Sequence, residues 1–123
     1  MKFKLFAAIA FAALPLGAAA HATDIATFLR KADALEKKGM MALFSSDLKV
    51  LKAEVQTAGE QLRAERLAAQ KAGRKPAYCP TGKSGIGAKE LLAHLRTVPP
   101  AQRSRLQVKD GLRSLLVRKY PCR

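Results

Sequence analysis

Apolar residues recur every three or four positions through most of the chain after residue 22, and this spacing is typical of helices with one buried face. The longest such stretch begins at the helix-start cluster Ser45-Ser46-Asp47 and ends near Lys71, just before Gly73. Its apolar positions are Leu48, Leu51, Val55, Ala58 and Leu62, with Val50 and Leu67 widening the stripe. The pattern therefore predicts one long amphipathic helix whose charged face, which includes Glu54, is solvated.

Three shorter segments show the same period and also predict helices. They are residues 23–38, 88–96 and 108–120. A proline pair follows the second of them and Pro121 ends the third, since proline cannot continue a helix. A short additional turn of helix is expected between these two segments, up to Leu106.

The predicted elements leave no room for a sheet, because no run of residues alternates apolar and polar side chains. Four or five helices of this size fit one domain of about 100 residues. The sequence therefore predicts an all-α fold, a small bundle of four to five helices that occupies residues 23–123.

A short apolar connector, Met40-Met41-Ala42-Leu43-Phe44, lies between the first and the second predicted helix. Five exposed apolar residues in a row would favour association with other molecules. We therefore expect the connector to be buried, with its two methionines filling gaps in the core rather than binding a metal.

Residues 1–22 have the three parts of a secretory signal peptide. Two lysines precede an apolar run of 16 residues, 5–20, and Ala20-His21-Ala22 supplies the small residues of a cleavage site. The run is shorter than the roughly 20 residues that a membrane-spanning helix needs. We therefore expect export to a bacterial-type periplasm and cleavage after Ala22.

The chain is strongly basic, with 23 lysines and arginines against 9 acids and a net charge of +14. Removing residues 1–22 would take away two lysines and no acid, which leaves 21 bases against 9 acids, a net charge of +12. Such a balance favours an anionic partner. Export argues against nucleic acid, so an anionic envelope surface or an acidic protein remains. The simpler alternative is that the charge only keeps the protein soluble.

Cys79 and Cys122 are the only cysteines, and an even pair in an exported protein is typical of a disulfide. An intramolecular bond would close a loop of 44 residues. The chain-entropy estimate of its contribution to stability is about 4 kcal/mol. Free thiols or an intermolecular bridge are the alternatives.

The segment between the long helix and residue 88 is rich in glycine and proline and predicts a loop. Residues 77–84 resemble a phosphate-binding loop, but no strand is expected before them, and Pro80 removes one backbone N–H. His94 is the only histidine after residue 22 and is expected at a helix edge. These residues predict no metal site, no cofactor and no catalytic residue, and hence no enzyme.

The C-terminal half combines a Cys-Pro loop with a terminal Pro-Cys. Its marks are Tyr78-Cys79-Pro80, the helix with Leu91-Leu92, the break Pro99-Pro100, and Tyr120-Pro121-Cys122. This layout, over residues 78–122, resembles the Rap/Tai family of periplasmic immunity proteins, which protect bacteria against amidase-type toxins of type VI secretion. The resemblance implies a small, exported, helical protein in which Cys79 and Cys122 are bridged.

The resemblance also implies a function, that of a non-enzymatic inhibitor that blocks the active-site cleft of a peptidoglycan amidase. The Gly-rich loop beside the implied bridge is the candidate partner-binding segment, because an anchored loop loses little entropy on binding. Its residues are Gly82, Lys83, Ser84, Gly85, Ile86 and Gly87. The alternatives are a basic envelope-surface protein that binds anionic lipid or lipopolysaccharide, and a housekeeping relative with another protein partner.

Overall fold

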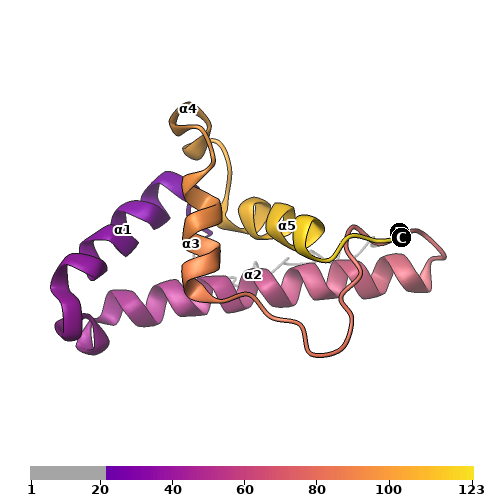
Figure 1. Ribbon diagram of the computed structural model, residues 1–123, viewed down its shortest axis with the longest axis horizontal. Helices are drawn as coiled ribbons and strands as arrows, with labels where there is room; N and C mark the ends of the chain where they lie inside the picture. The colour runs from indigo at the N-terminus through magenta and orange to yellow at the C-terminus, as the bar shows by residue number, and fades with distance from the viewer. Residues whose placement is uncertain (1–21) are drawn as a thin grey trace, which may run out of the picture.

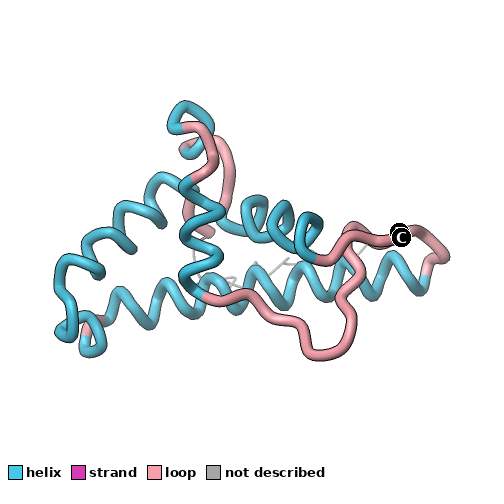
Figure 2. The backbone as a smooth tube through the Cα atoms, in the orientation of Figure 1, coloured by secondary structure: helices cyan, strands magenta, loops and turns pink. Residues whose placement is uncertain are grey.

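The computed structural model describes residues 22–123, so the signal peptide predicted for residues 1–22 lies outside the described residues except for Ala22. The described chain consists of helices and loops without a strand, which confirms the predicted all-α fold (Figure 2). The elements are α1 (Ile25–Lys38), the 3₁₀ helix η1 (Gly39–Phe44), α2 (Ser46–Lys71), α3 (Ala88–Arg96), α4 (Pro100–Arg103) and α5 (Val108–Lys119).

The long helix α2 is the base on which the other helices are arranged (Figure 1). Helices α1 and α2 meet at η1 and diverge from it like the arms of a V. Helix α5 packs along the C-terminal part of α2, and α3 crosses over to contact both α1 and α5. The chain end therefore lies near the C-terminal end of α2, on the opposite side of the molecule from η1 (Figure 1).

Side chains at the helix ends fix where α1, α2 and α5 begin. The Asp24 carboxylate accepts a hydrogen bond from the backbone N–H of Thr27 at 2.7 Å, and this bond lowers the pKa of Asp24. Ser45 caps α2 in the same way. Gln107 and Asp110 form a reciprocal capping box at the start of α5.

The core forms where α1 and α5 pack on one face of α2 and α3 packs against α1 and α5. Its members are Ile25, Phe28, Leu29, Ala32, Leu35, Leu51, Ala58, Leu62, Tyr78, Leu91, Leu95, Val108, Leu112 and Leu115. Leu48 and Val55 pack against this cluster from its border. The apolar stripe predicted for the long helix is thus confirmed in its centre.

The edges of that stripe were predicted wrongly. Val50 and Leu67 are 52% and 41% exposed, whereas Glu54, placed on the solvated face, is only 6% exposed. On an α-helix, Glu54 is turned about 60° from Leu51, whereas Val50 is turned about 100° and Leu67 about 160°. Only two neighbouring helices, α1 and α5, cover α2, so the buried stripe is narrow and its centre is shifted toward Glu54.

Candidate functional site

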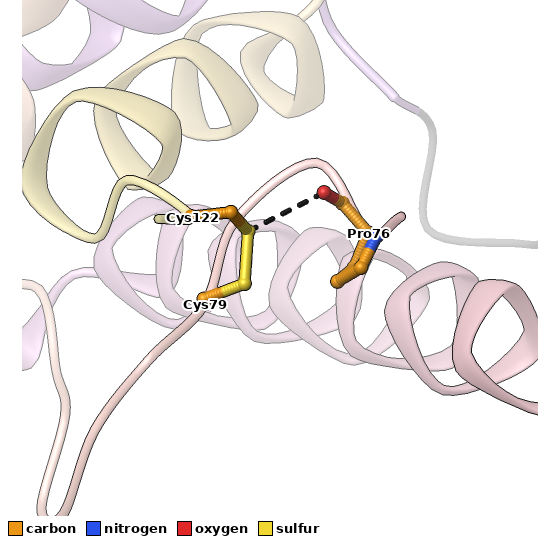
Figure 3. The surroundings of a disulfide bond; sticks show 3 residues. All are labelled: Pro76, Cys79 and Cys122. Carbon is orange, nitrogen blue, oxygen red and sulfur yellow. Dashed lines mark hydrogen bonds between the residues drawn. A yellow bond between two sulfur atoms is a disulfide. The ribbon is translucent and has the colours of Figure 1, made fainter. Parts of the chain in front are cut away.

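One disulfide joins the chain end to the segment that follows α2. Cys79 and Cys122 are bonded to each other at an S–S distance of 2.05 Å, and no free cysteine is present in residues 22–123. The bridge lies beside Pro76, whose carbonyl oxygen is 3.4 Å from the Cys122 sulfur (Figure 3). The Cys79 N–H donates to the Tyr120 carbonyl at 2.8 Å and adds a second link. The intramolecular bridge is thus confirmed.

The candidate binding loop, residues 82–87, follows this bridge and is held at Gly85. The Tyr120 hydroxyl accepts from the Gly85 N–H at 3.1 Å and lies 3.2 Å from the Gly85 carbonyl oxygen. The Lys119 ammonium donates to the same carbonyl at 2.9 Å. Lys83 and Ser84 are exposed between the bridge and this anchor, while Ile86 packs against the core. The loop is therefore fixed on both sides of its exposed part.

An ion pair strengthens the anchor of the loop. The Lys119 ammonium also contacts the Glu90 carboxylate at 2.9 Å. This hydrogen bond lowers the pKa of Glu90 and raises that of Lys119. An ion pair at such an exposed position contributes little to the free energy of folding, so its main effect is to orient Lys119 toward Gly85.

The similarity of residues 77–84 to a phosphate-binding loop does not extend to their setting. The segment that precedes them is a helix end followed by irregular chain, without the strand that such a loop needs. Cys79 is covalently occupied and Pro80 offers no N–H. These residues therefore provide no phosphate cradle.

The structure pairs His94 with a residue that the sequence did not single out, Ser114 of α5, at 2.6 Å. The Ser114 hydroxyl also donates to the Gly111 carbonyl at 3.0 Å. The pair links α3 to α5.

Glu65 of α2 joins two basic residues of α5, Lys109 and Arg113. Its carboxylate contacts the Lys109 ammonium through one oxygen and the Arg113 guanidinium through the other, at 3.1 Å. The contact with Lys109, followed by that with Arg113, lowers the pKa of Glu65. The three groups pair with one another, so the cluster ties α2 to α5.

The apolar connector is exposed, which contradicts the prediction that it fills the core. The exposed fractions of Met40, Met41, Leu43 and Phe44 are 79%, 68%, 63% and 85%. Only Ala42 packs against the core. The connector forms η1 at the vertex of the V, where α1 and α2 meet and no other helix of residues 22–123 crosses over it (Figure 1). We call Met40, Met41, Leu43 and Phe44 the apolar tip.

Lysines flank the apolar tip on both sides in the sequence. Lys37 and Lys38 are in the last turn of α1, and Lys49 and Lys52 are in the first two turns of α2; all four are exposed. We call these four residues the lysine rim. Glu36, the acid nearest to them in α1, is bound to Arg96 at 3.1 Å. Asp47 is then the one remaining acid in residues 36–52.

The part of the chain that the structure describes contains no group of three side chains that could ligate a metal ion. None of its helices is both long and apolar enough to cross a bilayer. No protein-family model, curated protein or solved structure matches the chain. A proposal about the function of the chain therefore rests on the arrangement of its own residues.

Proposed function

We propose that this chain is a non-enzymatic binding protein of the bacterial periplasm, and that the loop of residues 82–87 is its contact with a protein partner. The observation that carries the proposal is the anchoring of this loop. The Cys79–Cys122 bridge holds one side, and Tyr120 and Lys119 hold Gly85 on the other. An exposed segment fixed in this way loses little conformational entropy when it binds.

The resemblance of residues 78–122 to the Rap/Tai immunity proteins suggests the class of partner, an amidase that cuts peptidoglycan. The loop would enter the active-site cleft of the amidase and exclude the peptidoglycan strand. Lys83, at the exposed part of the loop, would meet acidic or polar groups at the cleft. Inhibition of this kind requires shape and charge complementarity and no chemistry by the inhibitor.

The first prediction tests whether the loop is the contact. Lys83→Glu is expected to weaken binding to a captured amidase by at least about ten-fold, because it reverses a charge at the interface. Lys71→Glu makes the same change at an exposed position on α2 and is expected to have little effect. The measurement is affinity capture from a periplasmic extract at about 0.3 M salt, where contacts between exposed charges alone are screened, followed by calorimetry with the purified partner.

Tyr120→Phe provides a sharper version of this test. It removes only the hydroxyl that holds Gly85 and retains the ring. If anchoring of the loop matters, binding should weaken several-fold while the protein remains folded. Equal affinity of the original chain, Lys83→Glu and Tyr120→Phe for the captured partner would assign the interface to another surface.

A further inference from the structure

The apolar tip concentrates most of the exposed large apolar side chains at one place. Seven such side chains are exposed in the described chain, and five of them, the four of the tip and Val50, lie within residues 40–50. Leu67 and Val117 are isolated and less exposed. Single exposed apolar residues are ordinary, whereas a cluster of this kind marks a surface that binds an apolar partner.

We propose that the apolar tip and the lysine rim form a docking site for a membrane surface that contains anionic phospholipid. The tip side chains would enter the boundary between headgroups and acyl chains. The rim ammonium groups would remain at the level of the lipid phosphates. The inference rests on the described residues alone and does not depend on an amidase partner.

The positive charge of the lysine rim favours an anionic lipid surface over the other apolar partners that the tip could bind. Four exposed lysines flank the tip in the sequence, and Glu36, one of the two acids near it, is paired with Arg96. Basic residues beside an apolar insertion favour an anionic bilayer, because headgroup phosphates and acyl chains offer both complements in one surface.

A second copy of the chain is a poor occupant of the same surface. Two tips that met would bring two lysine rims together, and like charges at close range oppose such contact. A groove of another protein would need an apolar floor and an acidic border that fit around the projecting tip. An anionic bilayer offers apolar acyl chains and acidic headgroups without the need for a groove of matching shape.

The position of the tip allows membrane docking and partner binding at the same time. The tip precedes the N-terminal end of α2, and the disulfide joins the chain end to the segment after α2, near the C-terminal end of that helix (Figure 1). Because α2 has 26 residues, its ends are about 39 Å apart. A molecule docked through the tip would therefore keep its bridged end away from the lipid.

Tryptophan fluorescence tests the proposal directly, because the chain has no tryptophan of its own. The protein carrying Phe44→Trp, purified from the periplasm of an exporting host, is mixed with vesicles of phosphatidylcholine that do or do not contain phosphatidylglycerol. A blue shift with the anionic vesicles, and quenching by lipids brominated on the acyl chains, is the expected result. Leu67→Trp, at an exposed site away from the tip, is the matched probe and should show neither change.

Two variants separate the apolar from the charged contribution. Met41→Ser with Phe44→Ser is expected to lower partitioning into anionic vesicles at least about ten-fold, with Leu67→Ser as the neutral control. Lys37→Gln with Lys38→Gln is expected to lower it about ten-fold at low salt, with Lys71→Gln with Lys75→Gln as the control. Circular dichroism confirms that each variant is folded.

The proposal is overturned if the indole of the Phe44→Trp variant stays in water with anionic vesicles, or if tip and control variants partition equally. It is also overturned if sedimentation shows a dimer that Met41→Ser with Phe44→Ser abolishes, because the tip then binds a second copy. Protection of the tip by a protein partner, without lipid binding, would have the same consequence.

A second, independent observation concerns the buried carboxylate of Glu54. Glu54 is the one charged residue buried in residues 22–123. Its Oε1 accepts from the backbone N–H of Thr23 at 2.7 Å, and the Thr23 hydroxyl lies 2.7 and 2.9 Å from its two oxygens. None of the ion pairs found in this part of the chain includes Glu54. A buried carboxylate without a cation is costly.

The backbone around Thr23 is fixed on its other side by the segment before α5. The Thr23 carbonyl accepts from the Val108 N–H at 3.2 Å, and the Ile25 N–H donates to the Leu106 carbonyl at 2.9 Å. The Thr23 nitrogen is thus held in place beside the Glu54 carboxylate, while the preceding residue, Ala22, is exposed.

We infer that Glu54 is a binding site for the free N-terminus created by cleavage after Ala22. Hydrolysis adds water across the Ala22–Thr23 peptide bond, so Ala22 leaves with a carboxylate and Thr23 retains an ammonium group. That ammonium would supply the missing cation. Processing would therefore convert a hydrogen-bonded carboxylate into a buried ion pair and stabilise the mature protein.

Two forms of the mature chain test this inference, one beginning at Thr23 and one that retains Ala22. Both keep the described core, whose residues run from Ile25 to Leu115. Retaining Ala22 is expected to raise the unfolding equilibrium constant about ten-fold or more, because it removes the ammonium from Glu54. In the Glu54→Gln background the two forms should be equally stable, whereas Glu60→Gln should preserve the difference.

Intact-mass measurement of the protein recovered from the periplasm gives its N-terminal residue and should identify Thr23. A mature N-terminus elsewhere, or equal stability of the two forms with Glu54 present, would refute the inference.

Discussion

Replacing both cysteines, Cys79→Ser with Cys122→Ser, is expected to lower the free energy of unfolding by about 4 kcal/mol. The bridge closes a loop of 44 residues, and removing it gives the unfolded chain the conformational freedom that the bond denies. Domains of this size have only about 5–10 kcal/mol of stability. The midpoint of thermal unfolding should therefore fall by roughly 15–30 °C.

Thermal unfolding followed by circular dichroism measures this effect. Dithiothreitol should lower the midpoint of the original chain to that of the serine variant and leave the variant itself unchanged, which controls for effects of the reductant. If the reduced chain, with its thiols verified as free, unfolds at the temperature of the oxidised chain, the bridge does not stabilise the fold.

Loss of the bridge should also change the candidate loop. The bridge and the Tyr120 hydroxyl hold the two sides of residues 82–84, and Tyr120 itself lies two residues before Cys122. Freeing Cys122 therefore loosens both anchors together. The serine variant is expected to bind a protein partner less tightly than Tyr120→Phe, even at a temperature where it remains folded.

The helices could be predicted from the sequence because their signals are local. Apolar spacing of three and four located α2, and prolines marked the ends of α3 and α5. The disulfide followed from the even cysteine count combined with the expectation of export, which are also properties of the chain alone. None of these predictions depended on which helices pack against each other.

The sequence alone could not tell whether the connector is buried or exposed, because this depends on which segments pack over it. A run of five apolar residues is compatible with a core and with a binding surface. The positions of the other helices determine which of the two it forms. Here α1 and α2 diverge from η1, and α3 and α5 cover the opposite end of the V (Figure 1). The basic residues on both sides of the run were the one local signal of a surface.

Glu54 and Ser114 were missed for the same reason. Glu54 is buried by Thr23, which lies 31 positions earlier, and Ser114 meets His94 from 20 positions later. Helical geometry places Glu54 at the border of the apolar stripe, but not its burial. Thr23 lies in extended chain just before α1, and the spacing that predicted a helix from residue 23 gave no indication that this residue contacts α2.

Gly111 gives the second large effect, since Gly111→Val is expected to destabilise the fold by about 2–3 kcal/mol. At this position α5 approaches α3 and α1 so closely that an added Cβ would overlap the Cδ2 atom of Leu95 and press on the Cδ1 atom of Ile25. Both of these side chains are fully buried, so neither moves aside without disturbing the close packing around it. Valine would therefore force the three helices apart.

Gly59 is the matched control, because it also lies within a helix but meets nothing within 4 Å of an added Cβ. Gly59→Ala should raise the stability by about 1 kcal/mol, since alanine favours the helix over the unfolded chain. Urea unfolding of the two variants is therefore expected to shift the midpoint in opposite directions. A midpoint for Gly111→Val at or above that of the original chain would contradict the close approach of α5 to α3. A lower midpoint, together with the rise for Gly59→Ala, would show that packing at Leu95 and Ile25, rather than helix propensity, sets the requirement for glycine at residue 111.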